Sequence, residues 1–135
     1  MADKLKLDIV TPDGLVASEE VDEVTAAGSE GEFGVVPGHA PFVTTLKIGM
    51  LVTKAGGQTT HYFVNWGYAE VGPGKVTVLA DSSEKSEEID VERARAAKER
   101  AEERLRRNEE VDFIRAQASL ERAVTRIHVA ERKLG

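Results

Sequence analysis

The chain has 135 residues and a mass of 14.7 kDa, enough for one ordinary domain or two small ones. Its net charge of −6 and pI near 5.1 argue against a nucleic-acid partner, which requires a basic face. The absence of cysteine excludes disulfides, iron–sulfur clusters and thiolate zinc sites, and no apolar run is long enough to cross a bilayer. We therefore expect a soluble chain that meets a membrane only through a partner.

The first part of the chain has the pattern of short β-strands separated by turns. Leu5, Leu7 and Ile9 alternate with polar residues, the period of two that buries one face of a strand. The sequence Pro12-Asp13-Gly14 predicts a turn, and Gly56-Gly57 and Pro73-Gly74 stand at hairpin positions. Other strand-like runs are 21–27, 41–46, 50–54, 61–64, 68–71 and 76–79. Many short strands of this kind indicate a sandwich or a barrel.

A change in composition divides the chain near residue 84. All four prolines and every glycine except Gly135 lie before that point, and no arginine occurs before Arg93. Residues 1–84 hold five lysines against twelve acidic residues, a net charge of −7, whereas residues 85–135 hold thirteen basic against twelve acidic residues. We predict a β-domain over 1–84 and a helical domain over 85–135, joined by the polar run 81–88 as a linker.

The helical domain has the apolar spacing of two helices. Asp90 is a candidate N-cap for the first helix, in which Ala94, Ala97, Ala101 and Leu105 form a stripe. After the polar interruption 108–110, Asp112 is a candidate cap for the second helix. There the apolar residues recur at spacings of three and four: Phe113, Ala116, Leu120, Ala123, Ile127, Ala130 and Leu134. The short connection makes the helices antiparallel, and so small a hairpin needs the β-domain or another protein to cover its seam.

Catalytic and metal-binding motifs find little support in the sequence. Residues 72–75, Gly-Pro-Gly-Lys, lack the first glycine of a phosphate-binding loop, and Val76 stands where its hydroxyl residue belongs. The glycine-rich run 28–34 lacks the dinucleotide-binding spacing, so we expect a loop or an edge-strand bulge there. The histidines show no metal-ligand spacing: His39, His61 and His128. We conclude that the chain is not an enzyme and has no metal site.

Arginines are spaced so that they face one another across the predicted hairpin. Arg100 and Arg104 lie four residues apart on the first helix, as do Arg122 and Arg126 on the second. Like charges at this spacing destabilise a helix, which calls for another explanation. Guanidinium groups from both helices can hold a polyphosphate. The alternatives are that these arginines are solvated or that they meet an acidic partner.

The run from Gly28 to Pro41, GSEGEFGVVPGHAP, resembles the signature loop of the epsilon subunit of F-type ATP synthase. Segments 69–71 and 76–81 are similar to the strands that follow in that family, and the helical pattern falls where the family has its hairpin. The resemblance covers essentially the whole chain, with a departure at Trp66, where the family commonly has glycine. It implies an α+β fold, an N-terminal antiparallel β-sandwich followed by a C-terminal antiparallel two-helix hairpin.

The resemblance also implies a non-catalytic rotor subunit in the central stalk of a proton-translocating ATP synthase. The sandwich would bind the gamma subunit and the ring of c subunits, with the interface near Glu30, Glu32 and His39. The hairpin would fold against the sandwich, or extend along gamma toward the catalytic alpha and beta subunits and inhibit ATP hydrolysis. Such a subunit lies at the cytoplasmic side of the bacterial inner membrane, attached through the complex, and requires no cofactor.

Some bacterial epsilon subunits bind ATP in the folded hairpin, through a motif of Ile or Leu, Asp, two variable residues, Arg and Ala. Residues 89–94, Ile-Asp-Val-Glu-Arg-Ala, match this motif in full. The resemblance therefore implies ATP as a regulatory ligand that favours the folded form. The residues that would bind it are Glu84, Ile89, Asp90, Arg93, Ala94, Arg100, Arg122 and Arg126.

An alternative function is a free-standing ATP-sensing module with no ATP synthase partner. It is supported by the facing arginines alone. It leaves the run 28–41 without an explanation.

Overall fold

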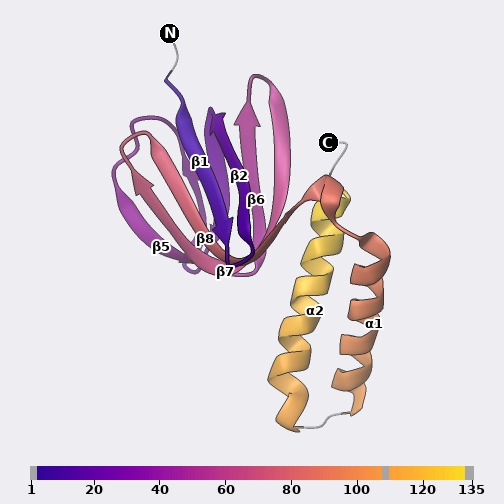
Figure 1. Ribbon diagram of the computed structural model, residues 1–135. Coiled ribbons are helices and arrows are strands. Elements are labelled where there is room, and N and C mark those ends of the chain that lie inside the picture. Colours follow the sequence, from indigo (N-terminus) through magenta and orange to yellow (C-terminus); the bar gives the residue numbers. More distant parts are fainter. Residues whose placement is uncertain (1–2, 108–109, 133–135) are drawn as a thin grey trace.

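The structure, a computed structural model, describes residues 3–107 and 110–132. Within these residues the chain forms eight β-strands, a short 3₁₀ turn and two α-helices (Figure 1). The strands are β1 (Leu5–Thr11), β2 (Gly14–Val21), β3 (Glu23–Gly28), β4 (Gly31–Val35), β5 (Phe42–Leu46), β6 (Gly49–Ala55), β7 (Gln58–Gly72) and β8 (Lys75–Lys85). The 3₁₀ turn is η1 (Ser86–Glu88), and the helices are α1 (Val91–Arg107) and α2 (Glu110–Ala130).

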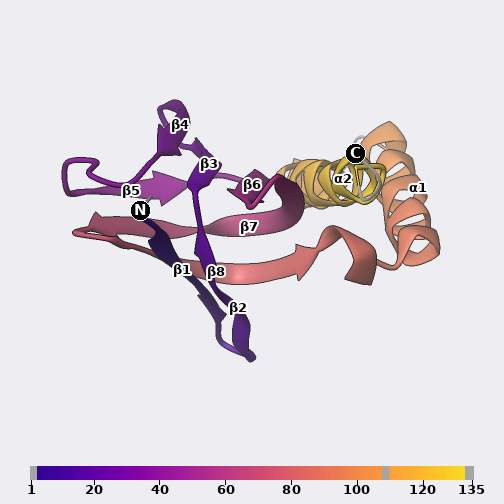
Figure 2. The ribbon, with the colours of Figure 1, turned by 90° about the horizontal axis from the view of Figure 1, so that it is seen from above.

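The strands form the predicted β-sandwich. Their order is β2-β1-β8-β7-β5-β3-β4, and β6 pairs with both β3 and β7. Figure 2 shows β5 and β6 on one side of β7, with β8 and β1 on the other. The pairs are antiparallel except that β1 and β8 run parallel. The predicted fold class is therefore confirmed, with one parallel pair within it.

The sandwich core is built from the alternating residues of the strands. Leu5, Leu7 and Ile9 are buried, as their period of two predicts. The rest of the core is aliphatic apart from one tyrosine: Val21, Val24, Ala26, Val35, Leu46, Leu51, Tyr62, Val64, Ala69, Val71, Val76, Val78 and Ala80. This core holds the sheet that carries the exposed groove described below.

The predicted turns lie where they were expected, but two predictions about the β-domain are wrong. Residues 12–13 connect β1 to β2, Gly56-Gly57 lies in the β6–β7 hairpin, and Pro73-Gly74 lies in the β7–β8 hairpin. The run 28–34 is a β3–β4 hairpin instead of a loop or bulge, because Gly31, at φ +131°, lets the chain reverse opposite Gly28. The run 81–88 is not a linker over its first five residues, because β8 continues through Lys85.

The polar end of β8 is held by pairing with β7. Glu84 lies opposite Phe63, and Ser83 lies opposite Val64. The Ser83 hydroxyl donates a hydrogen bond to the carbonyl of Phe63 at 2.7 Å. Serine and glutamate therefore extend the strand although neither is typical of one, because the partner strand supplies the hydrogen bonds.

The two helices form the predicted antiparallel hairpin. The Arg93 backbone N–H donates to Asp90 Oδ1 at 3.1 Å, which confirms Asp90 as the N-cap of α1. The helices meet through small side chains that are at most 3% exposed: Ala94 and Ala101 on α1, Ala116 and Ala123 on α2. Phe113, the first predicted seam residue, is 43% exposed instead.

The start of α2 corrects a further prediction. The helix begins at Glu110, so Asp112 lies inside it instead of capping it. Two other predicted features, the first part of the polar interruption (108–109) and Leu134, lie outside the described residues.

One end of the hairpin rests on the sandwich. Ile48 and Phe63 of the β-domain form a buried cluster with Ile89, Val129 and Ala130. Figure 1 shows that the C-terminal end of α2 lies beside the sandwich, while the rest of the hairpin projects away from it. The β-domain thus supplies the further surface that so small a hairpin requires, but only at this end.

Candidate functional site

A cavity of about 420 Å³ lies between the two helices and the end of β8. Its size falls in the range of small-molecule sites, roughly 300–1,000 Å³. It is lined by Glu84, Glu88, Asp90, Arg93, Ala94, Ala97, Arg100, Ser119, Arg122 and Arg126. We call it the arginine cavity.

The arginine cavity brings together most of the predicted ATP-binding residues. Glu84 comes from β8, Asp90 precedes α1, and the remaining members lie at helical spacing on the facing sides of the helices: Arg93, Ala94 and Arg100 on α1, Arg122 and Arg126 on α2. Ile89 does not line the cavity, because its side chain is 7% exposed and packs in the cluster beneath it. Arg104 faces a separate depression beside Glu103. Residues that the sequence reasoning missed are Glu88, Ala97 and Ser119.

The charges in the cavity favour an anion. Four arginines and three carboxylates line it. Among the described residues, only one of these arginines, Arg126, has a carboxylate within 4.0 Å, that of Glu84 at 3.2 Å. The Arg122 Nη2 donates to Ser119 Oγ at 3.1 Å, a neutral partner that leaves its charge uncompensated. Several guanidinium groups without carboxylate partners can bind a ligand with many negative oxygens, such as a polyphosphate.

The N-terminal turn of α1 adds to this positive potential. Arg93 and Ala94 lie in that turn and line the cavity. The first backbone N–H groups of a helix and its macrodipole both favour negative charge. The Asp90 side chain already caps one of these groups, so the arginines carry most of the attraction.

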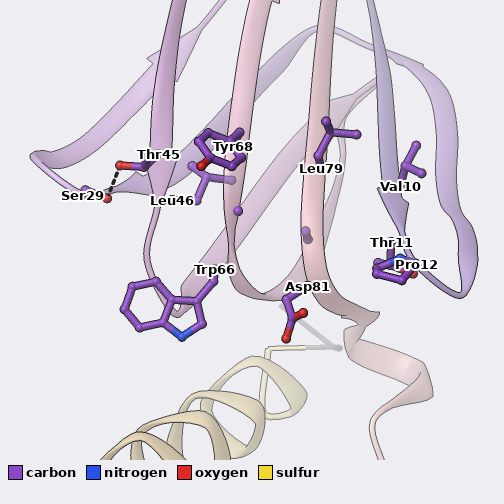
Figure 3. A pocket seen from close by; sticks show the side chains of 12 residues that line it. Val10, Thr11, Pro12, Ser29, Thr45, Leu46, Trp66, Tyr68, Leu79 and Asp81 are labelled. Atoms are coloured by element: carbon purple, nitrogen blue, oxygen red, sulfur yellow. Dashed lines mark hydrogen bonds between the residues drawn. The ribbon is translucent and has the colours of Figure 1, made fainter.

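A second candidate site is an apolar groove of about 750 Å³ on the outer face of the sandwich (Figure 3). Thr45, Tyr68, Leu79 and Val10 stand in register across β5, β7, β8 and β1, so they form a row on one face. Tyr68 and Leu79 are 57% and 53% exposed, although apolar side chains of this size usually pack away from water. We call this surface, with Trp66 at its lower end, the apolar groove.

Trp66 is held outward by a strained stretch of β7. Its φ is +53°, a left-handed conformation that is uncommon for a residue with a side chain, and the ring is 51% exposed. Gly67 follows at φ +148°, and a Cβ there would lie 2.1 Å from the carbonyl oxygen of Leu79. Glycine is therefore required at 67, and the bend it permits turns the Trp66 ring to the edge of the groove.

The predicted docking residues lie apart from the lining of the groove. Glu30 is in the β3–β4 turn, Glu32 is on β4 and His39 is in the loop before β5; all three are exposed. The ring of His39 packs against Phe42 at 5.1 Å and its Nδ1 lies 2.7 Å from the Ala40 carbonyl oxygen. Ser29, which precedes Glu30, lines the groove and is hydrogen-bonded to Thr45 (Figure 3). The acidic hairpin tip therefore adjoins one end of the groove.

Other observations limit the chemistry of the chain. Among residues 3–107 and 110–132, no group of three or more acidic or histidine side chains could hold a metal ion. In the same part of the chain, neither helix has the length and apolar character of a membrane span.

His61 is 9% exposed, and burial together with the charge of Arg132 lowers its pKa, against the opposing effect of Glu87.

Two family models match consecutive parts of the chain. Residues 4–86 match the beta-sandwich domain of the ATP synthase Delta/Epsilon chain, and residues 87–131 match its long alpha-helix domain. The ATP synthase epsilon chain of Geobacter metallireducens is 60% identical over 106 residues, 78% of this chain and 77% of that protein. The ATP synthase epsilon chain of Nitratidesulfovibrio vulgaris is 60% identical over 105 residues, 78% of each chain.

Solved structures give a similar result. A chain in the structure of the Euglena gracilis mitochondrial ATP synthase, described as OSCP/F1/c-ring, superposes with a TM-score of 0.82 at 28% identity. That match covers 100% of this chain and 84% of the other. A chain in the central stalk and c-ring of the Tetrahymena thermophila mitochondrial ATP synthase shares the fold, with a TM-score of 0.54 at 14% identity over 66% of this chain and 72% of the other.

Proposed function

Because the chain belongs to the ATP synthase delta/epsilon family, and within it to the epsilon chains of bacterial type, we propose that it is a non-catalytic rotor subunit of the central stalk. In this role the sandwich links the gamma subunit to the c-ring, and the hairpin inhibits ATP hydrolysis. ATP bound in the arginine cavity holds the hairpin in its folded form. The subunit lies at the cytoplasmic side of the membrane, attached through the complex.

The apolar groove supports docking of the sandwich on the gamma subunit. A row of exposed apolar side chains on a rigid sheet is typical of a surface that a partner covers. Trp66 stands at its edge, and tryptophan is enriched among residues that dominate binding energy. The acidic tip with Glu30 and Glu32 adjoins the groove and suits a polar rim, or the contact with the c-ring.

The way the hairpin is attached supports a mobile inhibitory element. Its two helices meet mainly through alanines, and among the described residues the cluster that joins it to the sandwich lies at one end, where Ile89, Val129 and Ala130 are buried. Alanine contacts bury little apolar area, so the free energy that separates docked and released forms is small. A two-state element of this kind is what a ligand or partner can shift.

The observation that carries the ATP part of the proposal is the convergence of Arg93, Arg100, Arg122 and Arg126 on one cavity. These side chains come from both helices, so a phosphate chain between them would bridge α1 and α2. A ligand that binds only the folded form stabilises that form by RT ln(1 + [L]/Kd). High ATP would therefore relieve inhibition by keeping the hairpin folded.

The inhibitory role is tested in the assembled enzyme. ATP hydrolysis is compared between complexes with the full chain and with a chain lacking residues 88–135. We expect faster hydrolysis with the shortened chain and an equal amount of it in the complex, because the sandwich is intact. Unchanged hydrolysis would remove the inhibitory role from the proposal, and loss of the shortened chain from the complex would show that the hairpin is needed for docking.

A further inference from the structure

Phe63 of β7 lies directly beneath one of the cavity arginines. Its side chain is fully buried in the cluster that joins the sandwich to the hairpin. The Arg126 Cζ lies over the Phe63 ring, 4.3 Å from its centroid. A guanidinium over an aromatic face at this distance is attracted by the negative face of the ring. The β-domain therefore reaches an arginine of α2 through a core residue.

Glu84 holds the same arginine from a second direction. Glu84 and Phe63 are directly opposite each other in the β7–β8 register, and Glu84 Oε2 lies 3.2 Å from Arg126 Nε. The Arg126 side chain is 27% exposed, so it is largely enclosed between these groups and α2. Among the described residues, its two terminal nitrogens have no hydrogen-bond partner, while Arg126 lines the cavity.

We propose that Phe63 is a positioning residue of the arginine cavity: its ring, with Glu84, fixes Arg126 in the orientation that receives a phosphate ligand. This inference rests on the proposed ATP binding and adds a part of the site that lies in the sandwich. A ligand on Arg126 is thereby coupled to docking of the hairpin. By linkage, docking raises the affinity for the ligand by the same factor by which the ligand favours docking.

The ring, and not the mere filling of space, is what the position requires. Ile48 lies in the same cluster and is 4% exposed, whereas the cation–π contact of Arg126 is with Phe63 and its ion pair is with Glu84. An aliphatic residue at 63 could still pack on Val129 and Ala130 but would present no negative face. Arg126 would then lose the support that keeps it extended over the cavity.

The test uses the full chain and calorimetric titration with ATP to millimolar concentration. Phe63→Leu is compared with Ile48→Ala, which removes the same number of carbon atoms from the same cluster. Both substitutions are repeated with Arg126→Ala. We expect Phe63→Leu to weaken ATP binding about three- to tenfold more than Ile48→Ala does, and this excess to vanish when Arg126 is alanine. Equal losses, or an excess that persists without Arg126, would overturn the proposal.

A ligand-free measurement separates this inference from ATP binding itself. Protons of Arg126 near the ring face should show an upfield ring-current shift in the NMR spectrum of the wild type, and Phe63→Leu should abolish it. Random-coil shifts for Arg126 in the wild type would contradict the positioning role whatever ATP does. If the ring-current shift is present but the wild type gives no heat with ATP, the nucleotide site falls, and with it the role of Phe63 in that site.

Discussion

The Nε atom of Arg126 lies 3.2 Å from Oε2 of Glu84, so an ion pair joins α2 to the last strand of the sandwich. The two residues are far apart in the sequence and belong to different parts of the fold. Their side chains are 27% and 38% exposed. The pair is therefore partly screened by solvent, and it acts as a weak tie between the hairpin and the sandwich.

Glu84→Gln should loosen the hairpin slightly. The neutral amide keeps the shape of the side chain but removes its charge. For a pair this exposed we expect the unfolding free energy to fall by about 0.5 kcal/mol, and by less at high salt because salt screens the pair. Thermal unfolding followed by circular dichroism at low and high salt measures it. The control is Glu103→Gln, whose ion pair with Arg106 is more exposed, at 51% and 69%, and which lies away from the N-terminus of α1, so the change should cost less. An equal cost for both would mean that the Glu84 pair is not a tie between the domains.

Ala123→Leu should destabilise the hairpin without affecting the sandwich. Ala123 is 1% exposed in the helix contact, so a larger side chain must push α1 and α2 apart, at a cost of about 1–3 kcal/mol. Hydrogen exchange resolves the two parts of the chain. We expect faster amide exchange in both helices and an unchanged exchange rate in the β7–β8 pair. Ala96→Leu, at an exposed position of α1, is the matched control and should leave exchange unchanged.

Trp66→Gly should change stability and partner binding in opposite directions. Glycine adopts a φ of +53° at little cost, so the isolated chain should gain about 1 kcal/mol in unfolding free energy. Binding to the gamma subunit should weaken about tenfold or more, because the groove loses its tryptophan. Surface-immobilised gamma measures the affinity, and Leu15→Ala, at a 63% exposed position that does not line the groove, serves as control. Unchanged affinity for the Trp66 variant would place the gamma contact elsewhere.

Stability should fall as the pH decreases below about 6.5, the ordinary pKa of histidine. The pKa of His61 is lowered in the folded chain, first by burial and then by Arg132. The unfolded chain therefore binds a proton more readily than the folded chain in the window below 6.5, and unfolding is favoured there. Melting temperatures between pH 8 and 5.5 measure the effect, and His61→Gln should make the dependence shallower. An unchanged slope in that variant would assign the pH dependence to other groups.

Local signals in the sequence predicted much of the fold. Asp90 was identified as an N-cap because the apolar spacing begins just after it, and its side chain does accept the Arg93 N–H. Such features depend on neighbouring residues. By contrast, the strand over 81–85 was predicted as a linker, because its polar residues gain their hydrogen bonds only from β7, across the β7–β8 hairpin. The β3–β4 hairpin was missed because its glycines suggested irregular backbone.

Part of the candidate site could likewise be predicted from local sequence, and part of it could not. Helical spacing was enough to place Arg100, Arg122 and Arg126 on facing sides of the hairpin. Arg104, which the same spacing grouped with them, faces a separate depression. The contact of Phe63 with Arg126 could not be predicted, because it depends on how the hairpin docks on the sandwich. The groove was also missed, since an exposed row across four strands requires the strand order and register. Ile89 matched a motif, yet it packs beneath the cavity instead of lining it.

The most direct test of the account is calorimetric titration of the full chain with ATP, for the wild type and for Arg122→Ala and Arg126→Ala. The control is Arg104→Ala, an arginine of α1 that faces away from the arginine cavity. We predict saturable one-to-one binding to the wild type and to the control, and affinity at least about tenfold weaker in the two cavity variants, since each removes a charge-assisted contact with phosphate. No heat in the wild type at millimolar ATP, or equal affinity in all four proteins, would contradict it.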